Sequence, residues 1–142
     1  SYFVGITECR SVNRFDKIEL RGEGTYGQVF MAREKQTQQI MALKKMKMEK
    51  EQEGFPVTAL RELTILKRMK HPNIVNMVEV VVGSRHDSVF LVFEYCEHDL
   101  ASLLDASASP PFSEAEIKRL MVQLLEAVAF MHEQWVIHRD IK

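Results

Sequence analysis

The glycine-rich segment Gly22-Glu23-Gly24-Thr25-Tyr26-Gly27 constrains this chain more than any other stretch. Its three glycines let the backbone turn sharply and approach an anion closely, because no Cβ stands in the way. Seventeen positions after Gly27, the apolar run Met41-Ala42-Leu43 leads to Lys44, a cation suited to phosphate. A glycine-rich turn alone is a weak signal. A turn followed by a strand and a lysine predicts a site for the phosphates of a nucleotide.

The same glycine spacing occurs in dinucleotide-binding turns, but these require a helix directly after the turn. Here the residues after the turn, Gln28 to Ala32, have the composition of a strand. A polar turn from Arg33 to Gln39 then leads to a third strand at Ile40 to Met46, and Phe15 opens a strand before the glycines. Short connections of this kind join antiparallel neighbours. The pattern therefore favours a hairpin lid over phosphates.

The composition restricts the class of protein, its partners and its compartment. The 142 residues are 46% apolar and 27% charged, a balance typical of a globular protein. A net charge of −1 gives no reason to expect nucleic acid as the main partner. Cys9 and Cys96 lie far apart, which favours a reducing compartment, the nucleus or the cytoplasm, over a disulfide framework or a zinc site. No apolar stretch has the length of a membrane span, so we expect no membrane partner.

A helix that carries a single, isolated acid follows the third strand. Pro56 suits a first helical position, and apolar residues recur at helical spacing from Val57 to Met69, until His71-Pro72 ends the pattern. Glu62 has only threonine, alanine, isoleucine and leucine three and four positions away. A carboxylate on a largely apolar face needs a partner from elsewhere. We therefore predict an ion pair with Lys44, although Glu62 taken alone would be interpreted as an exposed acid.

The rest of the chain predicts two more strands and two more helices. Ile74 to Val82 and Val89 to Phe93 form a strand pair with a polar turn between them. Asp99 is placed to cap a short helix, and Ser113 and Glu116 have capping-box spacing at the start of a longer one. The apolar stripe of this longer helix consists of Ile117, Leu120, Met121, Leu124, Leu125, Val128 and Met131.

The sequence ends in His138-Arg139-Asp140-Ile141-Lys142. Asp140 can orient a hydroxyl group and accept its proton, while Lys142 can neutralise charge on a transferred phosphoryl group. His-Arg-Asp is common by chance as a tripeptide. Here it follows the long helix and comes after the lysine and the glutamate in the order of the protein kinase template.

Five segments together resemble the cyclin-dependent kinase family, and the likeness covers nearly the whole chain. They are Gly22 to Gly27, Ala42 to Lys45, Gly54 to Glu62, His71 to Val75 and His138 to Lys142. The resemblance implies an α+β protein kinase fold with an antiparallel five-stranded N-lobe sheet, one main helix and the first helices of a truncated helical C-lobe. It also implies an N-terminal extension at residues 1–14, the N-lobe and hinge at 15–98, and the start of the C-lobe at 99–142.

The resemblance further implies the residues that bind ATP. Glu94 and Cys96 would offer hinge backbone groups to adenine, Phe93 would close the back of the pocket, and Asp99 would lie near the ribose. Thr25 and Tyr26 resemble inhibitory phosphorylation positions, where added negative charge would oppose the phosphates. The implied ATP-binding residues are Arg21, Gly22, Glu23, Gly24, Thr25, Tyr26, Gly27, Gln28, Val29, Ala42, Lys44, Phe93, Glu94, Cys96 and Asp99. The implied catalytic residues are Lys44, Glu62, Asp140 and Lys142.

Partners also follow from the resemblance. A cyclin would meet the segment Pro56 to Glu62, and the most similar member of the family suggests a cyclin of type M. Protein serine and threonine hydroxyls would be the substrates, in cell-cycle or transcription regulation. Two departures weaken the likeness, because Arg21 stands where relatives usually carry isoleucine and Val57-Thr58-Ala59 differs from the most similar member.

The kinase template also contains an asparagine five positions after Asp140 and a later Asp-Phe-Gly, which both hold Mg²⁺. Neither is present in this sequence, which also lacks an initial methionine. We therefore expect a fragment that carries no metal site of its own and is poorly soluble and inactive alone. The alternative is a natural short product that acts as a cyclin-binding or nucleotide-binding decoy without catalysis.

Overall fold

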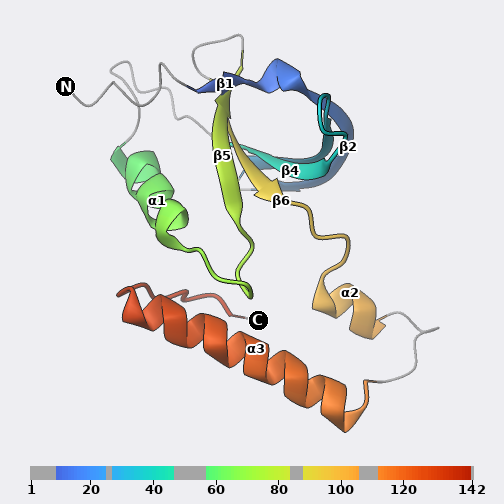
Figure 1. The fold of residues 1–142 in the computed structure, drawn as a ribbon, viewed down its shortest axis with the longest axis vertical. Helices are drawn as coiled ribbons and strands as arrows, with labels where there is room; N and C mark the ends of the chain where they lie inside the picture. The colour runs from blue at the N-terminus through green and yellow to red at the C-terminus, as the bar shows by residue number, and fades with distance from the viewer. Residues whose placement is uncertain (1–8, 25–26, 47–56, 84–87, 106–111, 142) are drawn as a thin grey trace. The chain divides into compact units, whose positions relative to one another are not determined.

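A computed structural model describes residues 9–24, 27–46, 57–83, 88–105 and 112–141. The chain divides into two compact units. The first contains Ser1–Thr64 and Met77–Tyr95, and the second contains Ile65–Asn76 and Cys96–Lys142. The first unit holds the sheet, whereas the second holds the two C-terminal helices, as Figure 1 shows.

The sheet has six strands in the order β1-β5-β6-β4-β3-β2. Neighbours are antiparallel except for the first pair, because β1 runs parallel to β5. The strands are β1 (Arg10–Ser11), β2 (Phe15–Gly24), β3 (Gly27–Glu34), β4 (Ile40–Lys45), β5 (Met77–Val82) and β6 (Val89–Glu94).

The prediction of five antiparallel strands was therefore wrong in number and in one direction. The sixth strand, Arg10–Ser11, comes from the segment that was interpreted as an extension. Two residues are too few to show the alternation of apolar and polar side chains that identifies a strand. Its pairing with β5 depends on residues about 70 positions away, such as Val81, which is the register partner of Arg10.

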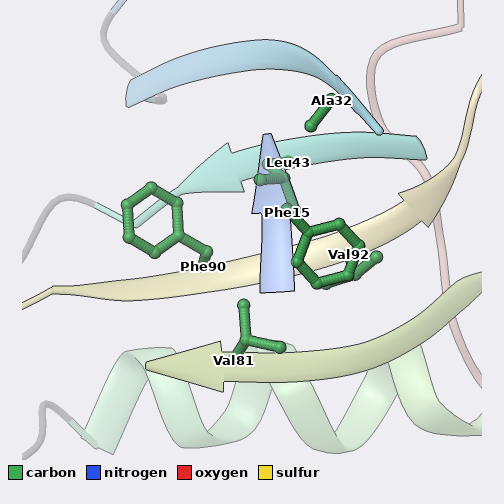
Figure 2. Packing of buried hydrophobic residues seen from close by; sticks show 6 residues of the cluster. All are labelled: Phe15, Ala32, Leu43, Val81, Phe90 and Val92. Carbon is green, nitrogen blue, oxygen red and sulfur yellow. The ribbon is translucent and has the colours of Figure 1, made fainter. Parts of the chain in front are cut away.

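The largest buried cluster described for the first unit lies on one face of this sheet. Side chains alternate along each strand, so every second residue of β4 and β6 points to the same side. Leu43, Val81 and Val92 are completely buried there. The whole cluster, drawn in Figure 2, consists of Phe15, Ala32, Leu43, Val81, Phe90 and Val92. Val12 packs against it from the short 3₁₀ helix η1 (Val12–Arg14), so residues before the first long strand help to cover the core.

Within the described ranges, three α-helices begin and end close to their predicted positions. They are α1 (Val57–Arg68), α2 (Leu100–Asp105) and α3 (Glu114–Glu133). Lys67 and Arg68 lie in the last turn of α1, where cations suit the helix dipole. Asp99 caps α2, because its Oδ1 accepts a hydrogen bond of 2.6 Å from the backbone N–H of Ser102. The short helix was therefore predicted correctly, including its cap.

The second unit packs residues 65–76 against α3. The rings of His71 and Phe130 lie 5.1 Å apart, and the Asn73 side chain donates to the carbonyl of Gln123 at 3.1 Å and to the Glu126 carboxylate at 3.0 Å. Much of the predicted apolar stripe of α3 is exposed, with Leu125 at 60%. Of the α3 residues, Ala127 is buried.

The predicted capping box of α3 is confirmed. Ser113 Oγ accepts from the backbone N–H of Glu116 at 3.3 Å, and the Glu116 carboxylate accepts from the backbone N–H of Ser113 at 2.8 Å. Hydrogen bonds from the backbone N–H and hydroxyl of Ser113 hold the pKa of Glu116 below its ordinary value. Both side chains satisfy N–H groups that the helix itself leaves without partners.

Replacing Ser113 by alanine is expected to lower the free energy of unfolding by about 1 kcal/mol, because one helix cap is lost. Chemical denaturation at neutral pH measures this, with Lys118→Ala on the same helix as the control. Because the pKa of Glu116 is lowered in the folded state, its stabilisation is complete above the ordinary value of 4.5 and is lost as the pH falls below it. A Ser113→Ala protein as stable as the control, with the same acid dependence as the unmodified chain, would contradict the expectation.

Candidate active site

Lys44 lies on β4 and forms the predicted ion pair with Glu62 of α1. Its Nζ is 3.6 Å from Glu62 Oε1, and both residues belong to the first unit. The lysine side chain is 27% exposed and the glutamate side chain 48% exposed, so the pair is partly open to solvent. A pair in this position leaves the ammonium able to contact a second anion while the carboxylate restrains it.

The alternation of β4 explains why Lys44, and not its neighbour Lys45, has this partner. Leu43 and Lys45 point to the core face, whereas Ala42 and Lys44 point to the other face. Lys45 is close enough to Lys17 to lower the pKa of that lysine, although burial of Lys17 is the larger cause. Two adjacent lysines therefore have different surroundings.

The strands on either side of residues 25–26 pair as the predicted antiparallel hairpin. β2 and β3 pair as far as Gly24 opposite Gly27, and Glu23 lies opposite Gln28. The Gln28 side chain donates to the Glu23 carboxylate at 3.1 Å. Gly27 has φ of 112°, a conformation that side chains other than hydrogen strongly disfavour. Strand β3 begins at Gly27, so the dinucleotide alternative, which needs a helix there, is excluded.

Several predicted ATP-binding residues share the face of the sheet that carries Lys44. Across the ladder, Lys44 is the register partner of Val29, and Ala42 is the partner of Phe93. Gly22 lies opposite Val29 in turn. Ala42 has a small side chain and lies two positions before Lys44 on the same strand. The sheet thus gathers Gly22, Val29, Ala42, Lys44 and Phe93 from four strands on one face.

Arg21 has a partner that the sequence did not indicate. Its guanidinium lies 5.9 Å from the centre of the Tyr95 ring and 3.5 Å from the Glu19 carboxylate. A hydrogen bond with Tyr95 is the main reason why the pKa of Arg21 is raised. The register of β2 against β3 shifts between Leu20 and Gly22, which places Arg21 at an irregularity of the strand. No local pattern could have identified a contact across 74 positions.

The second unit carries the predicted catalytic loop. Asp140 is exposed, and its backbone N–H donates to His138 Nδ1 at 3.1 Å, which agrees with a hydrogen-bonding role for that histidine. Arg139 has φ of 65° and Trp135 has φ of 60°. Left-handed conformations at non-glycine residues cost about 1 to 3 kcal/mol and are concentrated at functional sites. The loop is therefore held in a strained form around Asp140.

The other residues predicted to bind ATP, act in catalysis or contact a cyclin lie as follows. Cys96 is exposed and belongs to the second unit, whereas Glu94 is exposed at the end of β6 in the first. Asp99 caps α2, and that hydrogen bond from Ser102 is the main reason why its pKa is lowered. Thr25, Tyr26, Pro56 and Lys142 lie outside the described residues.

The structure also bears on metal ions and membranes. Within the described ranges, no three histidine, cysteine, aspartate or glutamate side chains are gathered as metal ligands. No helix in the same ranges is long and apolar enough to cross a bilayer.

Comparison with known proteins decides the family. The model of the protein kinase domain matches residues 15–142. This chain belongs to the protein kinase family. It is 55% identical over 134 residues to cyclin-dependent kinase G-2 of Oryza sativa subsp. indica and 53% identical over 134 residues to cyclin-dependent kinase 10 of Mus musculus. It is also 49% identical over 144 residues to the serine/threonine-protein kinase PITSLRE of Drosophila melanogaster.

These alignments cover 94%, 94% and 100% of the chain but only 19%, 37% and 15% of the three relatives. The chain thus spans well under half the length of the kinases that it matches. The predicted resemblance to cyclin-dependent kinases is confirmed.

Proposed function

We propose that this chain supplies the ATP-binding part and the catalytic aspartate of a cyclin-dependent protein serine/threonine kinase. The observation that carries the proposal is the 3.6 Å approach of Lys44 Nζ to Glu62 Oε1 on the face that also holds the glycine hairpin. Protein kinases require this lysine and glutamate to meet before phosphoryl transfer. The proposed boundaries are an N-lobe and hinge at 15–98 and a C-lobe that starts at residue 99. The nearby change of compact unit falls between Tyr95 and Cys96, and residues 65–76 also belong to the second unit.

ATP would bind through groups of the first unit. The Lys44 ammonium would contact the α- and β-phosphates, and the backbone of the glycine hairpin would cover them. Val29 and Ala42 would pack against the adenine base, with Phe93 behind it. Backbone groups of Glu94 and Cys96 would bind the base edge, and Asp99 would lie near the ribose. Val29, Ala42 and Phe93 lie on one face of the sheet, which supports this arrangement.

The chemistry needs few protein groups, because ATP supplies the transferred γ-phosphoryl group. Asp140 would accept the proton of a serine or threonine hydroxyl while the hydroxyl oxygen attacks the γ-phosphorus. The bond between that phosphorus and the departing ADP oxygen would break. Lys142 would stabilise the charge on the transferred group. The exposed position of Asp140 supports its accessibility to a protein substrate.

A cyclin would bind α1 and thereby secure the ion pair. Leu60 is 38% exposed on this helix, and Arg61 beside it is exposed. Glu62 is carried by the same helix turn, so a partner that holds α1 against the sheet would favour the Lys44 contact. This coupling of helix position to an ion pair gives a physical reason for cyclin dependence. A type M cyclin is the first candidate for the partner.

The test is phosphate transfer from ATP to a serine/threonine peptide by the intact protein, with and without cyclin. Activity is expected only with cyclin. Leu60→Asp is expected to abolish activation while binding of a fluorescent ATP analogue persists, because it removes apolar contact area on α1 and no group near the phosphates. Leu104→Asp, the same change at an exposed leucine of α2, is the matched control. Cyclin-independent transfer, or equal loss with both variants, would contradict the proposal.

A further inference from the structure

Residues 10–14 precede the part of the chain that matches the protein kinase domain, which begins at residue 15. They nevertheless form ordered structure, namely β1 and η1. We call residues 10–14 the strap. It leads directly into β2, whose far end is the glycine hairpin.

The strap closes one edge of the sheet. Arg10 and Ser11 pair in parallel with Val81 and Val82 of β5. Without this pairing, the edge of β5 would present open backbone groups, which proteins usually cover. Val12 then packs against the buried cluster that Figure 2 draws. The strap therefore covers both an edge and part of an apolar core.

Arg10 fixes one end of the strap to two acids. Its Nε donates to Glu79 Oε2 at 2.8 Å, its Nη2 bonds the second oxygen of the same carboxylate, and its Nη1 lies 3.8 Å from Glu34 Oε1. Arginine matches a carboxylate with two parallel bonds, which is stronger and more specific than a single contact. The hydrogen bond to Glu79 is the main reason why the pKa of Arg10 is raised. The Glu34 and Glu79 side chains are only 12% and 19% exposed, so both acids need a cation.

Arg14 fixes the other end to the same acid. Its Nη2 lies 3.4 Å from Glu34 Oε1, and it also donates to the Gln36 side chain. The backbone carbonyl of Arg14 accepts from Lys35 at 2.9 Å. Glu34 thus joins both ends of the strap to the end of β3, and the Thr37 hydroxyl contacts the same carboxylate.

We propose that the strap is a latch built into this kinase, closed by the Arg10 contact with Glu79 and opened when that contact is lost. Opening would expose the β5 edge and the Val12 side of the core. The inference does not depend on the proposed catalytic function, because it rests on contacts within the first unit alone. Salt is expected to weaken the ion pairs of Arg10, since its side chain is 44% exposed and therefore open to screening.

The test is hydrogen exchange, read by mass spectrometry, on peptides that contain residues 9–15 and 80–83 of the intact protein. Arg10→Ala and Glu79→Gln are each expected to raise the strap opening constant about two- to fivefold, the usual range for a partly exposed pair. The opening constant of the double variant is expected to be no larger than that of the more strongly affected single variant, because both substitutions remove the same interaction. Adding 1 M salt is expected to act in the same direction, and more strongly on the unmodified protein than on the double variant, which keeps only the Arg14 pair.

Lys35→Ala is the matched control. It removes an exposed ion pair with Asp16 at 3.4 Å but leaves the backbone bond to Arg14. Val12→Asn is the second variant, which is expected to open the strap without touching its charges. Additive effects of Arg10→Ala and Glu79→Gln, an effect of Lys35→Ala of the same size, or full exchange of residues 10–14 in the unmodified protein would overturn the proposal.

Discussion

Lys44→Met is expected to reduce kcat/KM for ATP by roughly 100- to 1000-fold, the usual loss when one group that stabilises transition-state charge is removed. Methionine keeps much of the side-chain volume, so the β4 strand and its partners Val29 and Leu91 retain their packing. The ammonium that pairs with Glu62 at 3.6 Å is lost. Steady-state kinetics of the cyclin-bound intact protein over a range of ATP concentrations measures the effect.

Lys45→Met is the matched control for this experiment. The two lysines are adjacent, have the same charge and differ in the face of the sheet to which they point. Activity of the Lys45 variant is expected to stay within about twofold, as for most substitutions away from a functional site. Equal losses with both variants would show that net charge on β4, and not the contact with Glu62, matters. Full activity of Lys44→Met would refute the assignment of the phosphate site.

Asp140→Asn is expected to lower kcat by roughly 100- to 10,000-fold while the affinity for ATP stays unchanged. Asparagine has the same shape and preserves the backbone bond to His138, but it cannot accept a proton. The position lies in the second unit, whereas the proposed phosphate-binding groups lie in the first. Phosphate transfer and binding of a fluorescent ATP analogue, measured on the same preparation, separate the two quantities.

Asp105→Asn provides the control for Asp140. It makes the same chemical change at an exposed residue at the end of α2. It is expected to leave kcat within about twofold. If Asp140→Asn weakened ATP binding as much as it lowered kcat, the residue would act in positioning the nucleotide and not as a base. The general-base assignment would then be abandoned.

Much of the fold was predictable because its signals are local. The hairpin around Gly27, the helix start at Ser113 and the cap at Asp99 each depend on a few neighbouring residues. The glycine, the capping box and the short polar side chain satisfy backbone requirements that do not change with the rest of the chain. The longer strands lie near their predicted positions, although β5 begins at Met77 and not at Ile74, and β3 extends to Glu34 and not to Ala32.

The site was predictable in part. The pairing of Lys44 with Glu62 could be inferred because an acid on an apolar helix face lacked a local partner. The contact of Arg21 with Tyr95 could not, since an exposed arginine gives no sign of a distant ring. The same holds for Arg10 and Glu79, which are 69 positions apart.

By itself, the amino-acid sequence determined the glycine hairpin, the helix caps, the catalytic motif and hence the kinase family, because each is a short-range arrangement of backbone and side-chain chemistry. Only the tertiary structure decided that the sheet has a sixth strand and that Glu34 joins both ends of the strap. Those features arise where segments far apart in the chain meet. Sheet register determines which strands pair, and the burial of Glu34 and Glu79 requires a cation beside them. No local sequence pattern shows either feature.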